Sequence, residues 1–397
     1  MKSIFKYSMM FAAALALSAS LSSCSDSDDD NNDGKDKTDG KVTVTGSDAT
    51  VAEAGNNWKA ARQDWEWSEA FLFGPAGDFS IDPHIDTWPF ANVQFDKYMA
   101  KYNPISDSGD AEILTEAITT GQNLTGFHAV EYLIFRNGES RKIADMTANE
   151  VWFAQTAAQD LYLASLKLVS AWGGSVTTAE QKMLDDAEFE SKDYGQDFIK
   201  AGQAGSSYSS VALATRQIIA GAKDIIGEVR DSKIGAPATG EDINYIESPH
   251  SYNSIVDFYD NIMSCKHTLY GGWTVTGNPT SSSLIGVCQR VEGLKTLANT
   301  VTEKMTNALE KVNAMKKPFV LYYSDQSAHD AMSALNELDD ALSALDEAIE
   351  PYGTQLDSYF KTVNEDFVNK SVIPTYRALA DNAKKMVESL NKLGWTK

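Results

Sequence analysis

Residues 332–351 read MSALNELDDALSALDEAIEP, and their apolar residues recur in steps of three and four. This spacing places one apolar stripe along a helix and leaves the acidic residues on the opposite, solvent-facing side. Pro351 cannot continue a helix, so we expect the helix to end there. The stretch therefore predicts a long amphipathic helix that packs against other helices. Its stripe consists of Met332, Leu335, Leu338, Leu342, Leu345 and Ile349.

Helical spacing continues through most of the chain beyond residue 48. Capping boxes at Thr147/Glu150 and Thr177/Glu180 each open a long periodic run. We find no convincing series of alternating strands, so the pattern predicts an all-α protein. Two packed domains, each resembling a four-helix bundle, are expected at 45–203 and 204–397, with the seam in the Gly/Ser cluster 202–207. Besides the helix at 332–351, the expected helices span 48–72, 109–121, 126–137, 147–172, 178–201, 207–229, 251–271, 283–315 and 354–394, and the expected long loops span 73–91, 230–250 and 272–283.

The first 44 residues are predicted to lie outside the fold. Residues 1–23 have a basic start, a short apolar run and small residues, which is typical of a secretory signal peptide. The ending Leu-Ser-Ser-Cys at 21–24 resembles a bacterial lipobox and implies lipid attachment to Cys24. Residues 24–44 then form an acidic tether, whose run at 27–30 resembles a surface-export signal of Bacteroides lipoproteins. We expect an outer-membrane lipoprotein, on the cell surface or on the periplasmic face.

The charge balance limits the partners. The 397 residues include 56 acidic and 34 basic side chains, for a formal net charge of −22. Such a chain is not a general nucleic-acid binder, because phosphate backbones attract basic surfaces. After lipidation, Cys265 and Cys288 remain, and the sequence leaves open whether they form a disulfide or stay as two buried thiols.

One segment carries metal-binding chemistry. In GFHAVEYLIF (126–135), His128 and Glu131 are three residues apart and share a helix face. An imidazole and a carboxylate at this spacing ligate metals in helical bundles, although a core-edge histidine paired with a carboxylate gives the same pattern. Gly126 would allow another backbone to approach closely.

This segment and others along the chain resemble the motifs of a known protein family. GFHAVE (126–131) resembles the Gly-x-His-x-x-Glu signature of the imelysin-like family. Residues 61–65 (ARQDW) with 68–75 (SEAFLFGP), 85–89 (IDTWP) and 247–254 (ESPHSYNS) are similar to further family segments, in the same order. His250 departs from the pattern, because an aromatic residue is usual there. The resemblance implies two four-helix bundles with the signature residues facing a cleft between them.

The matching motifs and their chemistry suggest a set of site residues. His128 and Glu131, with Glu69 and Asp86, are the expected metal ligands, and this oxygen-rich set with one histidine favours iron as the metal cofactor. Arg62 could clamp Glu69, bind a carboxylate of a chelated ligand, or form a surface ion pair. The residues expected to contact the ligand are Arg62, Trp88, Glu247, Ser248, Ser251 and Asp257, of which Ser251 and Asp257 could equally be a helix cap and a solvated side chain.

Three functions remain open. The first is an envelope lipoprotein for iron uptake, which binds a metal ion or small iron chelate and passes it to iron-transport components. The second is a metallopeptidase of the His-x-x-Glu kind, with Glu69 or Glu247 as general base. The third is a binder of an acidic polysaccharide. The acidic chain favours a cation over a polysaccharide, and the zinc-protease motif His-Glu-x-x-His is absent from the sequence. We therefore expect a binding protein rather than an enzyme.

Overall fold

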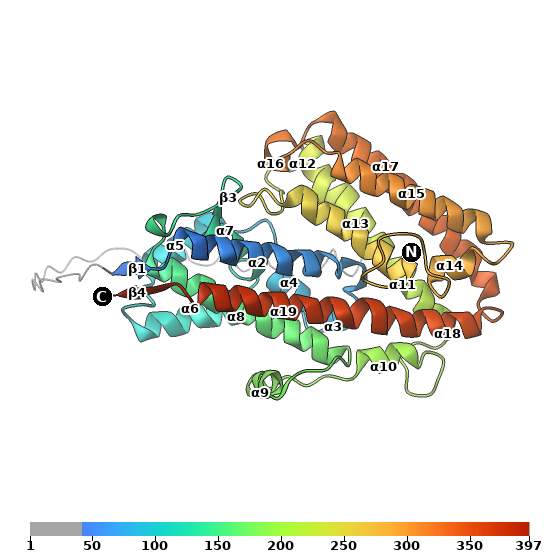
Figure 1. Cartoon of the computed structure of the whole chain (residues 1–397), viewed down its shortest axis with the longest axis horizontal. Coiled ribbons are helices and arrows are strands. Elements are labelled where there is room, and N and C mark those ends of the chain that lie inside the picture. The colour runs from blue at the N-terminus through green and yellow to red at the C-terminus, as the bar shows by residue number, and fades with distance from the viewer. Residues whose placement is uncertain (1–41, 397) are drawn as a thin grey trace, which may run out of the picture. The chain divides into compact units, whose positions relative to one another are not determined.

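Helix α19 (Ile373–Leu390), at the end of the chain, packs along α2 (Asp48–Glu66) and α8 (Ala148–Ala171), which lie near its beginning. This arrangement is visible in Figure 1, a view of the computed structural model, which describes residues 42–396. The predicted signal peptide, Cys24 and nearly all of the predicted tether lie outside the described residues. The all-α prediction is confirmed.

Helix α2 shows how the local sequence determines its position. The Ser47 side chain accepts a hydrogen bond from the backbone N–H of Thr50 and caps the helix start. The residues that face α19 and the core are spaced three and four apart and are fully buried, which fixes the rotation of the helix about its axis. These buried apolar residues are Val51, Ala54, Trp58, Ala61 and Trp65.

The first half of the chain forms further helices after α2. They are α3 (Pro75–Asp78), α4 (Ile81–Ile85), α5 (Asn92–Lys101), α6 (Ser108–Thr120), α7 (Gly126–Ile134), α8, α9 (Thr178–Asp186) and α10 (Tyr194–Ile199). Both predicted capping boxes, at the starts of α8 and α9, are present. Two corrections apply. The predicted helix 178–201 is interrupted between α9 and α10. The predicted loop 73–91 contains α3 and α4, and the one-turn helix η1 (Glu69–Phe71) lies just before this region.

The second half forms another layer, in which α11, α13, α15 and α17 pack against one another. Its helices are α11 (Val211–Glu228), α12 (Ala236–Thr239), α13 (Ser254–Tyr270), α14 (Leu284–Cys288), α15 (Lys295–Asn313), α16 (Phe319–Tyr322), α17 (Gln326–Ile349) and α18 (Asp357–Asp366). Helix α17 confirms the amphipathic helix predicted from residues 332–351. The two-domain division at 203/204 stays a prediction, and within the described chain α19, α11 and α13 of the second half all pack against elements of the first half.

Two π-helical segments interrupt the regular helices. Segment η3 (Val229–Gly235) extends α11 into the region that was predicted as a loop, and η5 (Phe367–Val372) joins α18 to α19. Pro374 at the start of α19 has no N–H to offer the carbonyl of Lys370, and this carbonyl accepts the backbone N–H of Trp273 instead (2.9 Å). Segments of this kind shift the side chains that follow them around the helix axis.

The described strands are short. Strand β1 (Thr43–Thr45) pairs antiparallel with β4 (Gly394–Thr396), so residues 43 and 44 belong to the fold rather than to the tether. Strands β2 (Phe135–Arg136) and β3 (Glu139–Ser140) form a hairpin after α7. Within residues 42–396, no helix is long and apolar enough to span a membrane. Cys265 and Cys288 are both buried free thiols, so no disulfide joins them.

Candidate functional site

Arg62 is the centre of a buried network of charges. It lies on α2 between Trp58 and Trp65, and its side chain is fully buried. Its guanidinium contacts Asp86 and Glu66, lies 2.7 Å from Glu247, and has its Nε atom 3.7 Å from Asp257. An arginine in such a place holds carboxylates from separate parts of the chain close together. It does not contact Glu69 as one of the sequence alternatives suggested, because α2 ends at Glu66, and its burial rules out a surface ion pair.

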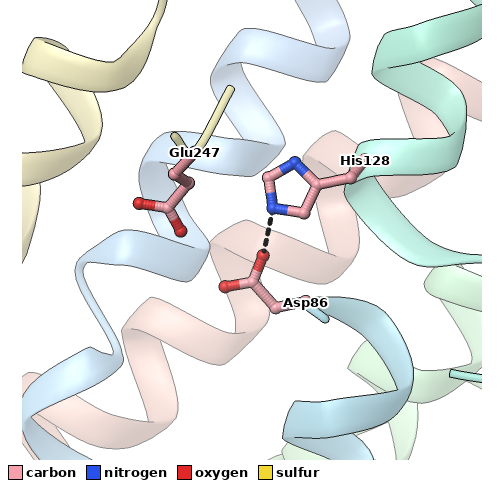
Figure 2. Close-up of side chains that lie close together, drawn as sticks. All are labelled: Asp86, His128 and Glu247. Atoms are coloured by element: carbon pink, nitrogen blue, oxygen red, sulfur yellow. Dashed lines mark ion pairs between the residues drawn. The ribbon is translucent and has the colours of Figure 1, made fainter. Parts of the chain in front are cut away.

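Asp86 is fixed in place from two sides. It follows directly after α4, and its Oδ2 atom accepts a hydrogen bond from the indole N–H of Trp65 (2.7 Å). Its Oδ1 atom lies 3.1 Å from Nε2 of His128, the contact drawn as a dashed line in Figure 2. Gly126 makes this approach possible. It has a φ of +72°, and a Cβ atom there would lie 2.1 Å from the carbonyl oxygen of Ile85. The start of α7 can therefore lie against the end of α4.

Glu131 faces the loop that precedes α13. Its Oε1 atom accepts hydrogen bonds from the backbone N–H groups of His250 (2.9 Å) and Ser251 (2.7 Å) and from the Ser251 hydroxyl (2.7 Å). Its Oε2 atom lies 3.5 Å from Nδ1 of His128. Glu131 thus orients the imidazole so that Nε2 faces Asp86.

Glu247 completes the group from the second half of the chain. Its Oε1 atom lies 2.7 Å from Arg62 and 3.1 Å from Nζ of Lys233, which η3 carries into the network. Lys233 is also 3.7 Å from Glu66, and it lies over the ring of Trp88. The Ser254 hydroxyl donates to the backbone carbonyl of Glu247 (2.6 Å) and holds this segment against α13.

Three groups of side chains have ligand atoms within 4.8 Å of one another. In the first group, Asp86, His128 and Glu247 come from three different elements, as Figure 2 shows. Oε2 of Glu247 is buried and has no hydrogen-bond partner within residues 42–396, and Nε2 of His128 has only its 3.1 Å contact with Asp86. Buried polar atoms are normally paired, so the Glu247 oxygen faces a position that a ligand could fill. The other two groups are Glu66–Glu247–Asp257 and Glu69–Asp82–Asp86.

The electrostatics of the network combine burial with close charges. Burial lowers the pKa of His128, but Asp86 and Glu131 outweigh it and raise this pKa to about 9. Burial raises the pKa of Asp86, whereas Arg62 and His128 bring it well below its usual value. Burial raises the pKa of Asp257 to about 7, despite the opposing effect of Arg62. Without a bound cation, protonated His128 therefore offsets part of the negative charge of the neighbouring carboxylates of Asp86 and Glu131.

Most of the residues that the sequence singled out converge here. Glu69 is the exception among the expected ligands, because it groups with Asp82 and Asp86 and not with His128. Trp88 packs on Lys233 and Tyr245, and the buried Ser248 hydroxyl has no hydrogen-bond partner within the described chain. The residues brought together in the network are Arg62, Asp86, His128, Glu131, Glu247, Ser251 and Asp257.

Sequence reasoning missed three members of the network. Glu66 stands four residues after Arg62, a spacing that predicts a contact on one helix face. Asp82 stands four residues before Asp86, and this spacing would have indicated a shared helix face if α4 had been predicted. Lys233 carried no such signal, because it lies in a π-helical segment within a region predicted as a loop.

Comparisons with known proteins agree with this architecture. Over 213 residues, the chain is 28% identical to iron-regulated protein A of Synechococcus elongatus, a match that covers 54% of this chain. The chain spans about half the length of that curated relative (51%). The crystal structure of an iron-regulated protein A precursor from Parabacteroides distasonis, described as putative, has a TM-score of 0.59 and 22% identity, covering 75% of this chain and 89% of the other. This likeness concerns the fold alone. The family model for imelysin (peptidase M75) matches residues 27–349, and the chain therefore belongs to the imelysin family.

Proposed function

We propose that this protein binds a metal ion through Asp86, His128 and Glu247. The observation that carries the proposal is the unpartnered Oε2 atom of Glu247, whose carboxylate lies with Nε2 of His128 and an oxygen of Asp86 within mutual ligand reach. One imidazole and two carboxylates form a donor set that suits ferrous iron or a similar divalent cation. The name of the iron-regulated relative from Synechococcus elongatus favours iron among these metals.

The surrounding residues have distinct roles in this proposal. Glu131 is a positioning residue for His128, since its carboxylate is not in the ligand group, its Oε1 atom accepts three hydrogen bonds and its Oε2 atom faces Nδ1 of His128. Arg62 holds Asp86 and Glu247 at a fixed separation. His128 must release its proton when an ion binds, because a metal needs the neutral imidazole.

The burial of the site favours binding over peptide hydrolysis. Exposed fractions are 7% for Asp86, 1% for His128 and 0% for Glu247. A metallopeptidase needs an open position on its metal and room for a peptide next to it. A site closed to this degree suits capture of a small cation. It also offers no exposed surface to a polysaccharide.

The proposal includes a place in the cell envelope. It is supported by the lipobox-like sequence that ends at Cys24 and the acidic residues that follow. A lipid-anchored metal-binding protein would deliver its cation to transport components of the same envelope. Replacing Cys24 with Ser should abolish incorporation of a labelled fatty acid and release the protein from the membrane fraction. Unchanged labelling would contradict the anchor and leave the metal site untouched.

Calorimetric titration of the protein with ferrous iron, without oxygen, tests the metal site. We expect one ion per chain for the wild type and no binding for His128→Ala. His329→Ala is the control, because His329 is an exposed histidine on α17, outside the network. If wild type and His128→Ala bind iron equally, the assignment is wrong.

A further inference from the structure

Asp86 belongs to two ligand groups, and only one of them contains a histidine. In the second group, Glu69 begins η1 while Asp82 and Asp86 are four residues apart around α4. The ligand oxygens of these three side chains lie within 4.8 Å of one another. The structure therefore separates two residues expected to share one site, with Glu69 on one side of Asp86 and His128 on the other.

Unpartnered polar side chains accompany this second group. Glu69 is 6% exposed, and its carboxylate has no hydrogen bond or ion pair with any described residue. The hydroxyl of Tyr376, on α19, is fully buried and also has no hydrogen-bond partner there. Glu69 and Asp82 are the charged neighbours that act on this hydroxyl. A fully buried hydroxyl without a partner is costly, unless a ligand satisfies it.

The second group is also the more accessible one. Asp82 is only partly buried, whereas His128 and Glu247 are buried. Glu228, at the end of α11, has an exposed side chain, and its negative charge acts on both Glu69 and Asp82. Asp82 is thus the member of the second group nearest to solvent, while Glu69 and Asp86 are buried.

We infer that Glu69, Asp82 and Asp86 form a second cation position, which shares Asp86 with the position at His128 and Glu247. The inference rests on the proposed function, because it extends the same centre. Three carboxylates supply oxygen ligands only, and such a set prefers a hard cation, in contrast to the group that includes an imidazole. The chain thus offers two adjacent positions with different metal preferences.

Terbium(III) and cobalt(II) distinguish the two positions in the full-length protein. Terbium is a hard cation, and light absorbed by Trp65, whose indole bonds Asp86, can sensitise its emission. Cobalt(II) reports imidazole ligation through its absorption spectrum. We expect Glu69→Gln/Asp82→Asn to weaken terbium binding by about tenfold or more, since affinity follows the number of charged ligands. The same variant should retain cobalt binding, and His128→Ala should show the opposite pattern.

Glu303→Gln/Glu310→Gln, on the exposed face of α15, removes the same charge elsewhere and should leave terbium binding unchanged. If Glu69→Gln/Asp82→Asn binds terbium as this control does, the second position is rejected while the cobalt result still stands for the first. Suppose instead that the wild type binds terbium but no cobalt, and that Glu69→Gln/Asp82→Asn no longer binds terbium. The proposed function then fails and the second position survives. Asp82→Asn alone, at a partly buried residue, repeats the test should the double variant unfold.

Discussion

Nη2 of Arg62 lies 2.7 Å from Oε1 of Glu247, and this contact joins α2 to a segment 185 residues further along the chain. Both side chains are fully buried. The same guanidinium contacts Asp86 and Glu66, so one positive charge holds carboxylates from several elements. The network therefore fixes the relative positions of segments from both halves of the chain.

Arg62→Met should strongly destabilise the fold. The substitution removes the cation and leaves buried carboxylates without compensation, a change that costs about 3–5 kcal/mol in other proteins. Urea denaturation of the metal-free protein measures this loss. Arg216→Met is the control, because Arg216 pairs with Asp346 in a partly exposed position, where loss of an ion pair costs about 1 kcal/mol or less. Equal losses in both variants would show that the buried network does not stabilise the fold.

Glu131→Gln should weaken metal binding without abolishing it. Removing a group that orients a ligating histidine typically lowers affinity about 10–100-fold. His128→Ala, which removes the ligand itself, should leave no measurable binding. Calorimetric titration with ferrous iron compares the two variants. If Glu131→Gln binds as poorly as His128→Ala, then Glu131 is a ligand and its assignment as a positioning residue is wrong.

Lys233→Met should raise the affinity for a divalent cation. Nζ of Lys233 lies 3.1 Å from Glu247, and its positive charge opposes a second cation at that carboxylate. Two charges a few ångströms apart interact by a few kcal/mol at the effective dielectric of a protein, so we expect a gain of about tenfold or more. Lys182→Met, on the exposed side of α9, controls for the change in net charge. An unchanged affinity in Lys233→Met would indicate that Glu247 does not ligate the ion.

Asp64→Asn should change how stability depends on pH. Asp64 is buried, and burial raises its pKa to about 7, although the amide of Asn382 donates a hydrogen bond to it (2.6 Å). Because the folded pKa exceeds the unfolded value, this group stabilises the fold below about pH 4, and that stability is lost as the pH rises through 7. The advantage of Asp64→Asn over wild type should therefore grow with pH, reaching on the order of 4 kcal/mol.

Thermal or urea unfolding between pH 4 and pH 8 measures this difference. Asp340→Asn is a close match, because Asp340 accepts a hydrogen bond from Asn336 (3.2 Å) at an exposed position. A constant difference between Asp64→Asn and wild type across this range would contradict the effect of burial on Asp64.

The helical architecture could be predicted because burial of an apolar stripe is encoded by residues close in sequence. Helix α17 follows this rule from Met332 to Ile349. The break between α9 and α10 was missed, because residues 187–193 contain neither Gly nor Pro. Asp193 was the available signal, since its side chain accepts the backbone N–H of Gln196 and begins α10.

The candidate site could be predicted only in part. His128 and Asp86 were found through motifs, and their contact depends on Gly126, which the sequence also marked. Their partners were harder to assign, because a carboxylate's role depends on its long-range contacts. The Glu131 carboxylate accepts hydrogen bonds from the backbone of residues 250–251, which begin 119 residues further along the chain. Lys233 enters the network through a π-helical segment, whose register local sequence patterns do not encode.

The pairing of Thr43 with Thr396 brings the first and last described residues of the fold together. A short peptide linker could therefore connect these ends, and the chain could be reopened elsewhere. Gly205 is a suitable point, because it lies in the connection between α10 and α11 and a Cβ atom there would meet nothing within 4 Å. A circular permutant opened at Gly205 would keep α2, α7 and η3 intact, and with them the spatial arrangement of Arg62, His128 and Lys233.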